Sequence, residues 1–301
     1  MQRFQRILVA IDLSLEGRTI TPGSARAAEQ ALWLAGRTGA ALSFLHSTWS
    51  DIHEEGPAIR SGPSPEGVQV LEELVARAEG ASVRAQLVLV RERAWMELIR
   101  AVQRGEGDLV LVARRNQLDG GALPGGVARK LMRKCPCPVW VVRPEARLEP
   151  RVIVAATDLT RVGNVAVELA AELAQVAGAE LHVIHAWQLP ASVPILSELE
   201  LPLRSPQELG ELERATRQRF DENLRSLELR LMPRTHVECA PPSQAIRALV
   251  EELGAELLVM GTVSRGGIAG FLVGNTAERL LDRVQCSLLT IKPQDFVSPL
   301  R

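Results

Sequence analysis

A glycine-rich segment near the C-terminal end of the chain has the residue types and spacing of a phosphate-binding turn. Residues 260–278 follow an apolar run and lead into a helical pattern. Glycines at such a junction permit positive φ and let phosphate oxygens approach backbone N–H groups, while the helix N-terminus adds partial positive charge. The segment predicts a nucleotide-phosphate site, with the candidate residues Met260, Gly261, Ser264, Arg265, Gly266, Gly274, Asn275 and Thr276.

This segment resembles the motif Gly-x2-Gly-x9-Gly-Ser/Thr of nucleotide-binding members of the universal stress protein family. Gly261 and Gly274 match, whereas Ser264 replaces the second glycine and Asn275 replaces the hydroxyl residue. The resemblance implies an ATP site in the C-terminal half, with Mg²⁺ accompanying the nucleotide. Backbone N–H groups bind phosphate whatever the side chain, and Ser264 costs little where the loop has φ < 0 but is penalised in a left-handed conformation. Helix capping by Asn275, with Glu278 at the third helical position, is an alternative explanation.

The resemblance also implies site residues outside the motif. Asp158 ends the first strand of this half and matches an acidic residue near the adenosine, where a carboxylate accepts from a ribose hydroxyl or base amine. Val183 matches an apolar position against the adenine, and Met260 would line the same pocket. Burial in strands would equally explain Val183 and Met260, and Asp158 could instead cap the following helix.

The two halves of the chain are duplicates of each other. Each alternates short, almost wholly apolar β-branched runs with helical patterns, which is typical of parallel strands buried on both faces. We expect two tandem Rossmann-like α/β domains, over residues 1–145 and 150–295. The resemblance implies that each is an open five-stranded parallel sheet of order 3-2-1-4-5 with helices on both faces. The repeated segments are 6–14 with 151–160, 39–46 with 178–185, 107–112 with 255–260, and 137–144 with 286–293.

The connection between the halves, residues 144–150, is too short for a free tether. We therefore expect the halves to dock as an intramolecular pseudo-dimer, with contact between the strands expected at 139–142 and 288–291. Residues 52–65 and 189–206 are expected to form loops. The apolar stretch 189–196 is expected to cover a cavity or the other domain.

The N-terminal half has lost the phosphate motif. Ala113 and Asn116 stand where glycines belong and Val127 where a hydroxyl belongs, so that Gly126 alone survives. Arg114 and Arg115 could recruit an anion, or could simply be solvated surface. We expect this half to be structural or regulatory.

Composition and the remaining motifs narrow the function further. The net charge of −1 over 301 residues argues against nucleic-acid and anionic-membrane partners, and the apolar runs are shorter than a membrane span, so we expect a cytoplasmic protein. Cys135 and Cys137 lack the spacing of a metal or redox site, which predicts buried free thiols and no metal ligands. The repeated His46 and His185 are expected to be hydrogen-bonded structural residues.

These features predict a tandem universal stress protein that acts as a stress-response binding and regulatory module, with an ATP site in its C-terminal domain. No catalytic residues are assigned, because Gly-Lys-Ser/Thr is absent and no nucleophile is paired with a base. One alternative is a slow ATPase that uses the loop 261–276. Another is a non-nucleotide member that binds an apolar or lipid-like ligand between the domains.

Overall fold

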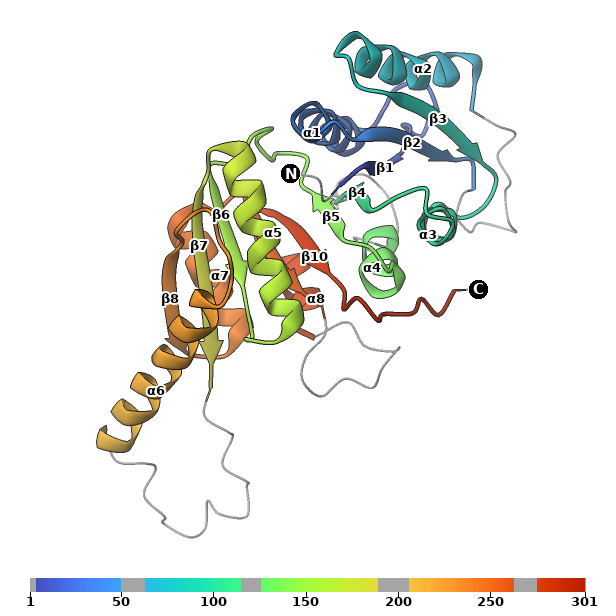
Figure 1. Ribbon diagram of the computed structural model, residues 1–301. Coiled ribbons are helices and arrows are strands. Elements are labelled where there is room, and N and C mark those ends of the chain that lie inside the picture. Colours follow the sequence, from blue (N-terminus) through green and yellow to red (C-terminus); the bar gives the residue numbers. More distant parts are fainter. Residues whose placement is uncertain (1–3, 50–62, 115–125, 189–205, 263–274, 301) are drawn as a thin grey trace.

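The two halves of the chain form two α/β domains that share one continuous sheet (Figure 1). The computed structural model describes residues 4–49, 63–114, 126–188, 206–262 and 275–300. The expected loop stretches 52–62 and 189–205, and the candidate residues Ser264, Arg265, Gly266 and Gly274, lie outside these ranges.

The N-terminal domain alternates strands and helices along the chain. Its elements are β1 (Arg6–Ile11), α1 (Pro22–Thr38), β2 (Ala41–Ser47), α2 (Pro65–Gly80), β3 (Ala85–Val90), α3 (Ala94–Gln103), β4 (Leu109–Ala113), α4 (Gly126–Lys134) and β5 (Val139–Val142). The C-terminal domain repeats this order with β6 (Val152–Ala156), α5 (Arg161–Ala177), β7 (Glu180–Trp187), α6 (Pro206–Arg225), β8 (Arg234–Cys239), α7 (Pro242–Leu253), β9 (Leu257–Gly261), α8 (Asn275–Arg283) and β10 (Ser287–Ile291).

The strand order is β3-β2-β1-β4-β5-β10-β9-β6-β7-β8. Within each half the strands are parallel, and the order 3-2-1-4-5 predicted for each domain is confirmed. The halves join where β5 pairs antiparallel with β10, placing Trp140 opposite Leu289. The carboxyl edge of one half-sheet therefore lies beside the amino edge of the other.

Equivalent helices in the two halves begin and end with the same local chemistry. The hydroxyls of Thr21 and Thr160 accept from backbone N–H groups in the first turns of α1 and α5. Gly39 and Gly178 end these helices in the left-handed conformation, with φ of 76° and 65°, as the expected glycine stop signals require.

Helices cover both faces of the sheet. Helices α1, α2, α5 and α6 pack on one face, where Leu34, Leu71 and Phe220 are fully buried. Helices α3, α4, α7 and α8 pack on the other, where Leu98 and Leu131 are fully buried. Two apolar layers of this kind fix the strand ends, and with them the loops that could bind a ligand.

Candidate functional site

The carboxyl ends of β6 and β9 form the edge at which the predicted site residues meet. These two strands are neighbours, with Ala156 opposite Met260, so that Gly261 at the end of β9 and Asp158 just after β6 lie at adjacent strand ends. From β6 the chain proceeds outward to β7 and β8, whereas β9 and β10 lie on the other side. Ligands of open α/β sheets bind at the carboxyl ends of strands at such a switch point.

Two predicted pocket residues are not brought together. Val183 on β7 is fully buried in the apolar layer under α5 and α6. Met260 is 5% exposed and belongs to the layer on the opposite face, under α7 and α8. Thr276 lies in the first turn of α8, and Asn275 is the first residue of that helix.

Asp158 lies in a tight turn that joins β6 to α5. Its Oδ1 accepts from the backbone N–H of Thr160 at 3.1 Å and from the Thr160 hydroxyl at 2.5 Å. The Thr157 hydroxyl accepts from the N–H of Leu159, whose φ is 62°. The N-cap of α5 is Thr160, so the alternative in which Asp158 caps this helix is wrong. The turn instead fixes the carboxylate at the switch point.

Gly261 meets the structural requirement for a glycine through close packing and not through positive φ. A Cβ at this position would lie 2.8 Å from Cγ1 of Val162, in the first turn of α5. In the N-terminal half, the equivalent contact joins Gly23 of α1 to Ala113 of β4, with the smaller residue on the helix. The same helix–strand contact therefore has its glycine on the helix in the N-terminal half and on the strand in the C-terminal half.

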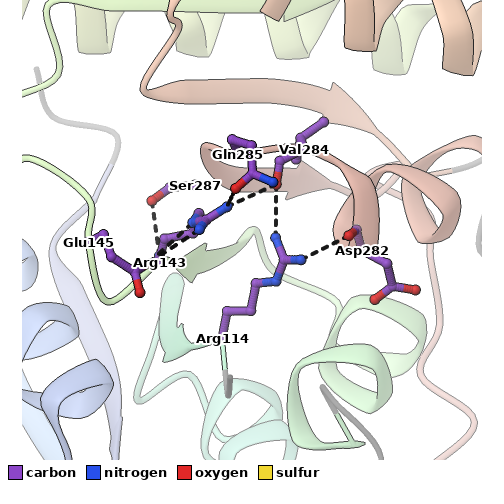
Figure 2. A network of polar contacts seen from close by, with 7 residues as sticks. All are labelled: Arg114, Arg143, Glu145, Asp282, Val284, Gln285 and Ser287. Carbon is purple, nitrogen blue, oxygen red and sulfur yellow. Dashed lines mark hydrogen bonds and ion pairs between the residues drawn. The ribbon is translucent and has the colours of Figure 1, made fainter. Parts of the chain in front are cut away.

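Arg114 connects the degenerate loop of the N-terminal half to α8 (Figure 2). Its guanidinium donates to the carbonyls of Val284 and Asp282, both at 3.0 Å. Arg143, which follows β5, donates to the Val284 carbonyl at 3.3 Å and to the Gln285 side chain. Cations at a helix C-terminus satisfy carbonyls that lack partners within the helix. Arg114 thus serves the domain interface, not the anion site considered for it; Arg115 lies outside the described residues.

Helices α4 and α8 are joined by ion pairs. Arg133 of α4 donates to both carboxylate oxygens of Glu278, with Nη2 2.8 Å from Oε2, and Arg129 pairs with Asp282. Hydrogen bonding from Arg133 lowers the pKa of Glu278. Both oxygens of Glu278 accept from Arg133, so this side chain contributes to the domain interface.

The repeated histidines have equivalent structural roles. Nδ1 of His46 lies 2.9 Å from the carbonyl of Ile11, and Nδ1 of His185 lies 2.9 Å from the carbonyl of Thr157. Both side chains are buried. These contacts tie the second strand of each half to the end of the first, as expected for structural histidines.

The cysteines are free, but they differ in exposure. Cys135 is buried as expected, and Cys286 is also buried, whereas Cys239 is exposed. Cys137, which was expected to be buried, is half-buried, with its sulfur 3.5 Å from that of Cys135. Burial raises the pKa of Cys286 to about 12. Within the described ranges no cluster of three or more His, Cys, Asp or Glu side chains could hold a metal ion.

Sequence reasoning missed two polar groups. His182 and His236 stack with ring centroids 5.2 Å apart, and Nδ1 of His182 lies 3.0 Å from Nε2 of His236. Lys292, directly after β10, is 8% exposed and its Nζ has no hydrogen-bond partner among the described residues. The duplication offered a signal for Lys292, because it aligns with Arg143 in the repeated segments.

A separate cleft of about 340 Å³ lies at the amino edge of the C-terminal half, beside the inter-domain connection. Its lining includes the charged side chains of Arg143, Arg147, Glu251 and Glu256. Among the helices that the structure describes, none combines the length and apolar composition needed to cross a membrane.

Comparisons with known proteins agree with the duplicated architecture. The model of the universal stress protein family matches residues 3–143 and again residues 150–292. Universal stress protein E of Escherichia coli K12 is 28% identical, with 100% of this chain and 98% of the relative covered. The protein of the same name from Photorhabdus laumondii is 26% identical, with 100% and 99% covered.

Solved structures show the same fold. A putative universal stress protein from Pseudomonas aeruginosa UCBPP-PA14 gives a TM-score of 0.69 at 24% identity, over 98% of this chain and 95% of that one. A protein of unknown function from P. aeruginosa PAO1 gives 0.70 at 23% identity, over the same shares. With one family domain in each half, the chain belongs to the universal stress protein family as a tandem member.

Proposed function

We propose that this protein is a stress-response regulatory module that binds ATP, with accompanying Mg²⁺, in its C-terminal domain. The observation that carries the proposal is the placement of the motif. The segment between the end of β9 at Gly261 and the start of α8 at Asn275 opens at the switch point, beside the turn that fixes Asp158. A glycine motif supports nucleotide binding only in such a strand-to-helix context.

The described residues supply complementary parts of a nucleotide site. The Asp158 carboxylate can accept from the ribose hydroxyls, because the turn after β6 holds it at the strand end. The N-terminus of α8 provides N–H groups and partial positive charge for the phosphates. Met260, directly before Gly261, is buried under α7 and α8 and supports the end of β9 from within the core. Binding of this kind needs no chemical step.

The N-terminal domain serves a different role in this proposal. Ala113 replaces the first motif glycine, and Arg114 is engaged with the carbonyls of α8. An arginine anchored in this way holds the two domains together. The chain then carries one nucleotide per molecule, and the N-terminal domain supports and regulates that site.

Isothermal titration calorimetry with ATP, with and without Mg²⁺, tests the proposal. We expect one site in the micromolar range. Asp158→Asn keeps an acceptor for Thr160 but removes the charge, and should weaken ATP binding about tenfold, as expected for a lost charge-assisted hydrogen bond. Asp12→Asn, at the equivalent position of the N-terminal half, is the matched control and should bind as the wild type does.

Absence of heat from correctly folded wild-type protein would refute ATP binding. Equal loss in Asp158→Asn and Asp12→Asn would refute the assignment to the C-terminal domain. Release of inorganic phosphate in the same samples, abolished by Asp158→Asn, would favour the slow ATPase. A ligand of apolar mass retained in native mass spectrometry, with no response to ATP, would favour the third alternative, a site between the domains.

A further inference from the structure

Lys292 is a buried cation whose ammonium group lacks a hydrogen-bond acceptor among the described residues. The residue is 8% exposed, and its Nζ lies 4.6 Å from the ring centroid of Phe296. Burial lowers its pKa to about 8, while the charges of Cys135 and Glu278 act in the opposite direction. Leaving an ammonium buried without an acceptor is costly, and such a group calls for an explanation.

The duplication shows what a satisfied cation at this position looks like. Arg143, which aligns with Lys292, follows β5 and donates to the Val284 carbonyl and the Gln285 side chain (Figure 2). Those acceptors lie at the C-terminal end of α8. The strand-end cation of the N-terminal half thus receives protein oxygens from the helix end of the other half, whereas the equivalent ammonium of the C-terminal half has none among the described residues.

Lys292 also lies on the edge of the candidate nucleotide site. It directly follows β10, which runs parallel to β9, with Ile291 opposite Gly261. The backbone N–H and hydroxyl of Thr262 both donate to the Ile291 carbonyl, at 3.0 and 3.1 Å. Glu278, which acts on the charge of Lys292, lies in the first turn of α8. The backbone of Lys292 therefore follows directly on the strand that pairs with the end of β9, and its ammonium is within electrostatic range of the first turn of α8.

We propose that Lys292 binds a phosphoryl group of the nucleotide and supplies the cation that a Walker lysine supplies elsewhere. This inference rests on the proposed function, because it assigns the phosphate end of the same site. A phosphate oxygen would be the acceptor that the buried ammonium lacks, and the N–H groups of α8 would contact the same anion. Lys292 then selects nucleotides over the uncharged nucleoside.

A purely structural role makes the opposite stability prediction. If Lys292 only neutralised the C-terminal end of α4 near Cys135, replacing it would destabilise the protein. If it awaits an anion, Lys292→Met should raise the melting temperature of the ligand-free protein, since a buried unpaired charge is replaced by an apolar side chain of similar length. The same variant should lose the stabilisation that ATP gives the wild type.

Binding measurements with ATP and adenosine test the assignment directly. Lys292→Met should lower the affinity for ATP at least tenfold and leave the affinity for adenosine unchanged. Lys292→Arg should retain part of the affinity for ATP. Lys130→Met is the matched control, because Lys130 on α4 lies over the Trp95 ring of α3. Wild-type affinity for ATP in a folded Lys292→Met protein would overturn the inference, and equal losses for ATP and adenosine would do the same.

A labelling experiment tests the role of Lys292 independently of ATP binding. If the wild type bound no ATP, the proposed function would be refuted, but the labelling result would still decide whether Lys292 binds phosphate. The chain has only three lysines, Lys130, Lys134 and Lys292. Pyridoxal 5′-phosphate forms an imine with a lysine amine, and borohydride reduces this to a stable secondary amine. Labelling of Lys292 that inorganic phosphate blocks supports a phosphate site. Labelling of only Lys130 and Lys134, or labelling of Lys292 that phosphate does not affect, overturns it.

Discussion

The contact between Val162 and Gly261 gives a second explanation for the glycine, besides its match to the phosphate motif. Gly261 matches the first glycine of the phosphate motif, yet its absent side chain also makes room for Cγ1 of Val162. In the other half, Gly23 makes the same room for Ala113. Packing alone therefore explains a small residue at position 261.

This explanation predicts a specific double-mutant result. Gly261→Ala places a Cβ within 2.8 Å of Val162 Cγ1 and should destabilise the protein by about 1–3 kcal/mol, as overpacking does. Val162→Ala removes that methyl group and should rescue most of the loss when the two changes are combined. Urea denaturation of the four proteins measures the coupling. Additive losses would show that the contact does not determine the residue at 261.

The stacked histidines predict a second property at this scale, a loss of stability in mild acid. Desolvation and the neighbouring His182 lower the pKa of His236, and Arg217 acts in the same direction, against Glu238 and Glu252. Because the folded pKa lies below the unfolded value of about 6.5, the unfolded chain takes up the proton first as the pH falls. The contribution of His236 is therefore present above pH 6.5 and is lost below it.

Denaturation midpoints between pH 8 and pH 5 test this. His236→Gln keeps a polar side chain without a titrating ring and should flatten the part of the profile that begins below pH 6.5. His46→Gln is not a suitable control because that ring is bonded to Ile11 in the core. Gln86→His is the better comparison, because it adds a titrating ring on the exposed side of β3 near Ser43. An unchanged profile in His236→Gln would refute the assignment.

At the scale of elements, α8 is held by the N-terminal domain at both ends. Its first turn carries Glu278, which pairs with Arg133, and its last carbonyls accept from Arg114 and Arg143. The helix that begins at the candidate nucleotide site is therefore also part of the domain interface. A change in its position would be communicated to both domains.

The contacts at the two ends of α8 should contribute unequally to the free energy of unfolding. Arg114→Ala leaves the Asp282 carbonyl and part of the Val284 carbonyl without their charged donor, and should cost about 1.5–3 kcal/mol. Arg133→Ala removes an ion pair in which the arginine side chain is 54% exposed, and should cost less than about 1 kcal/mol. Urea denaturation ranks the variants. A larger loss for Arg133→Ala would show that the carbonyl contacts are not the stronger restraint.

The sequence was sufficient for these elements but not for the contacts between them. The repeated segments 39–46 and 178–185 correspond to the second strands, β2 at Ala41–Ser47 and β7 at Glu180–Trp187, because the apolar pattern of a strand is local. The partners of Arg114 lie 168 and 170 residues away, so no local pattern could reveal that its charge is used by a helix end. The replacements at Ser264 and Asn275 could be seen in the sequence, but their effect on phosphate binding depends on the conformation of the loop.

At the scale of the whole molecule, the two domains are joined through the sheet, through helices and through the connection between them. The sheet continues from β5 into β10, and ion pairs join α4 to α8 beside it (Figure 1). The C-terminal residues run back along the N-terminal domain, where Gln103 donates to the Leu300 carbonyl. The connection also docks, since Gln30 donates to the Leu148 carbonyl and Trp33 to Glu149. The domains thus behave as one structural unit.

Fusion of the two copies in one chain has an evolutionary consequence. In a dimer of identical subunits, any substitution appears on both sides of the axis, so a strand-end cation cannot be satisfied on one side and unsatisfied on the other. Here Arg143 and Lys292 occupy equivalent places with different surroundings. A single gene product can therefore retain a ligand on one side and specialise the other as its fixed support, in a stoichiometry that no change in expression can alter.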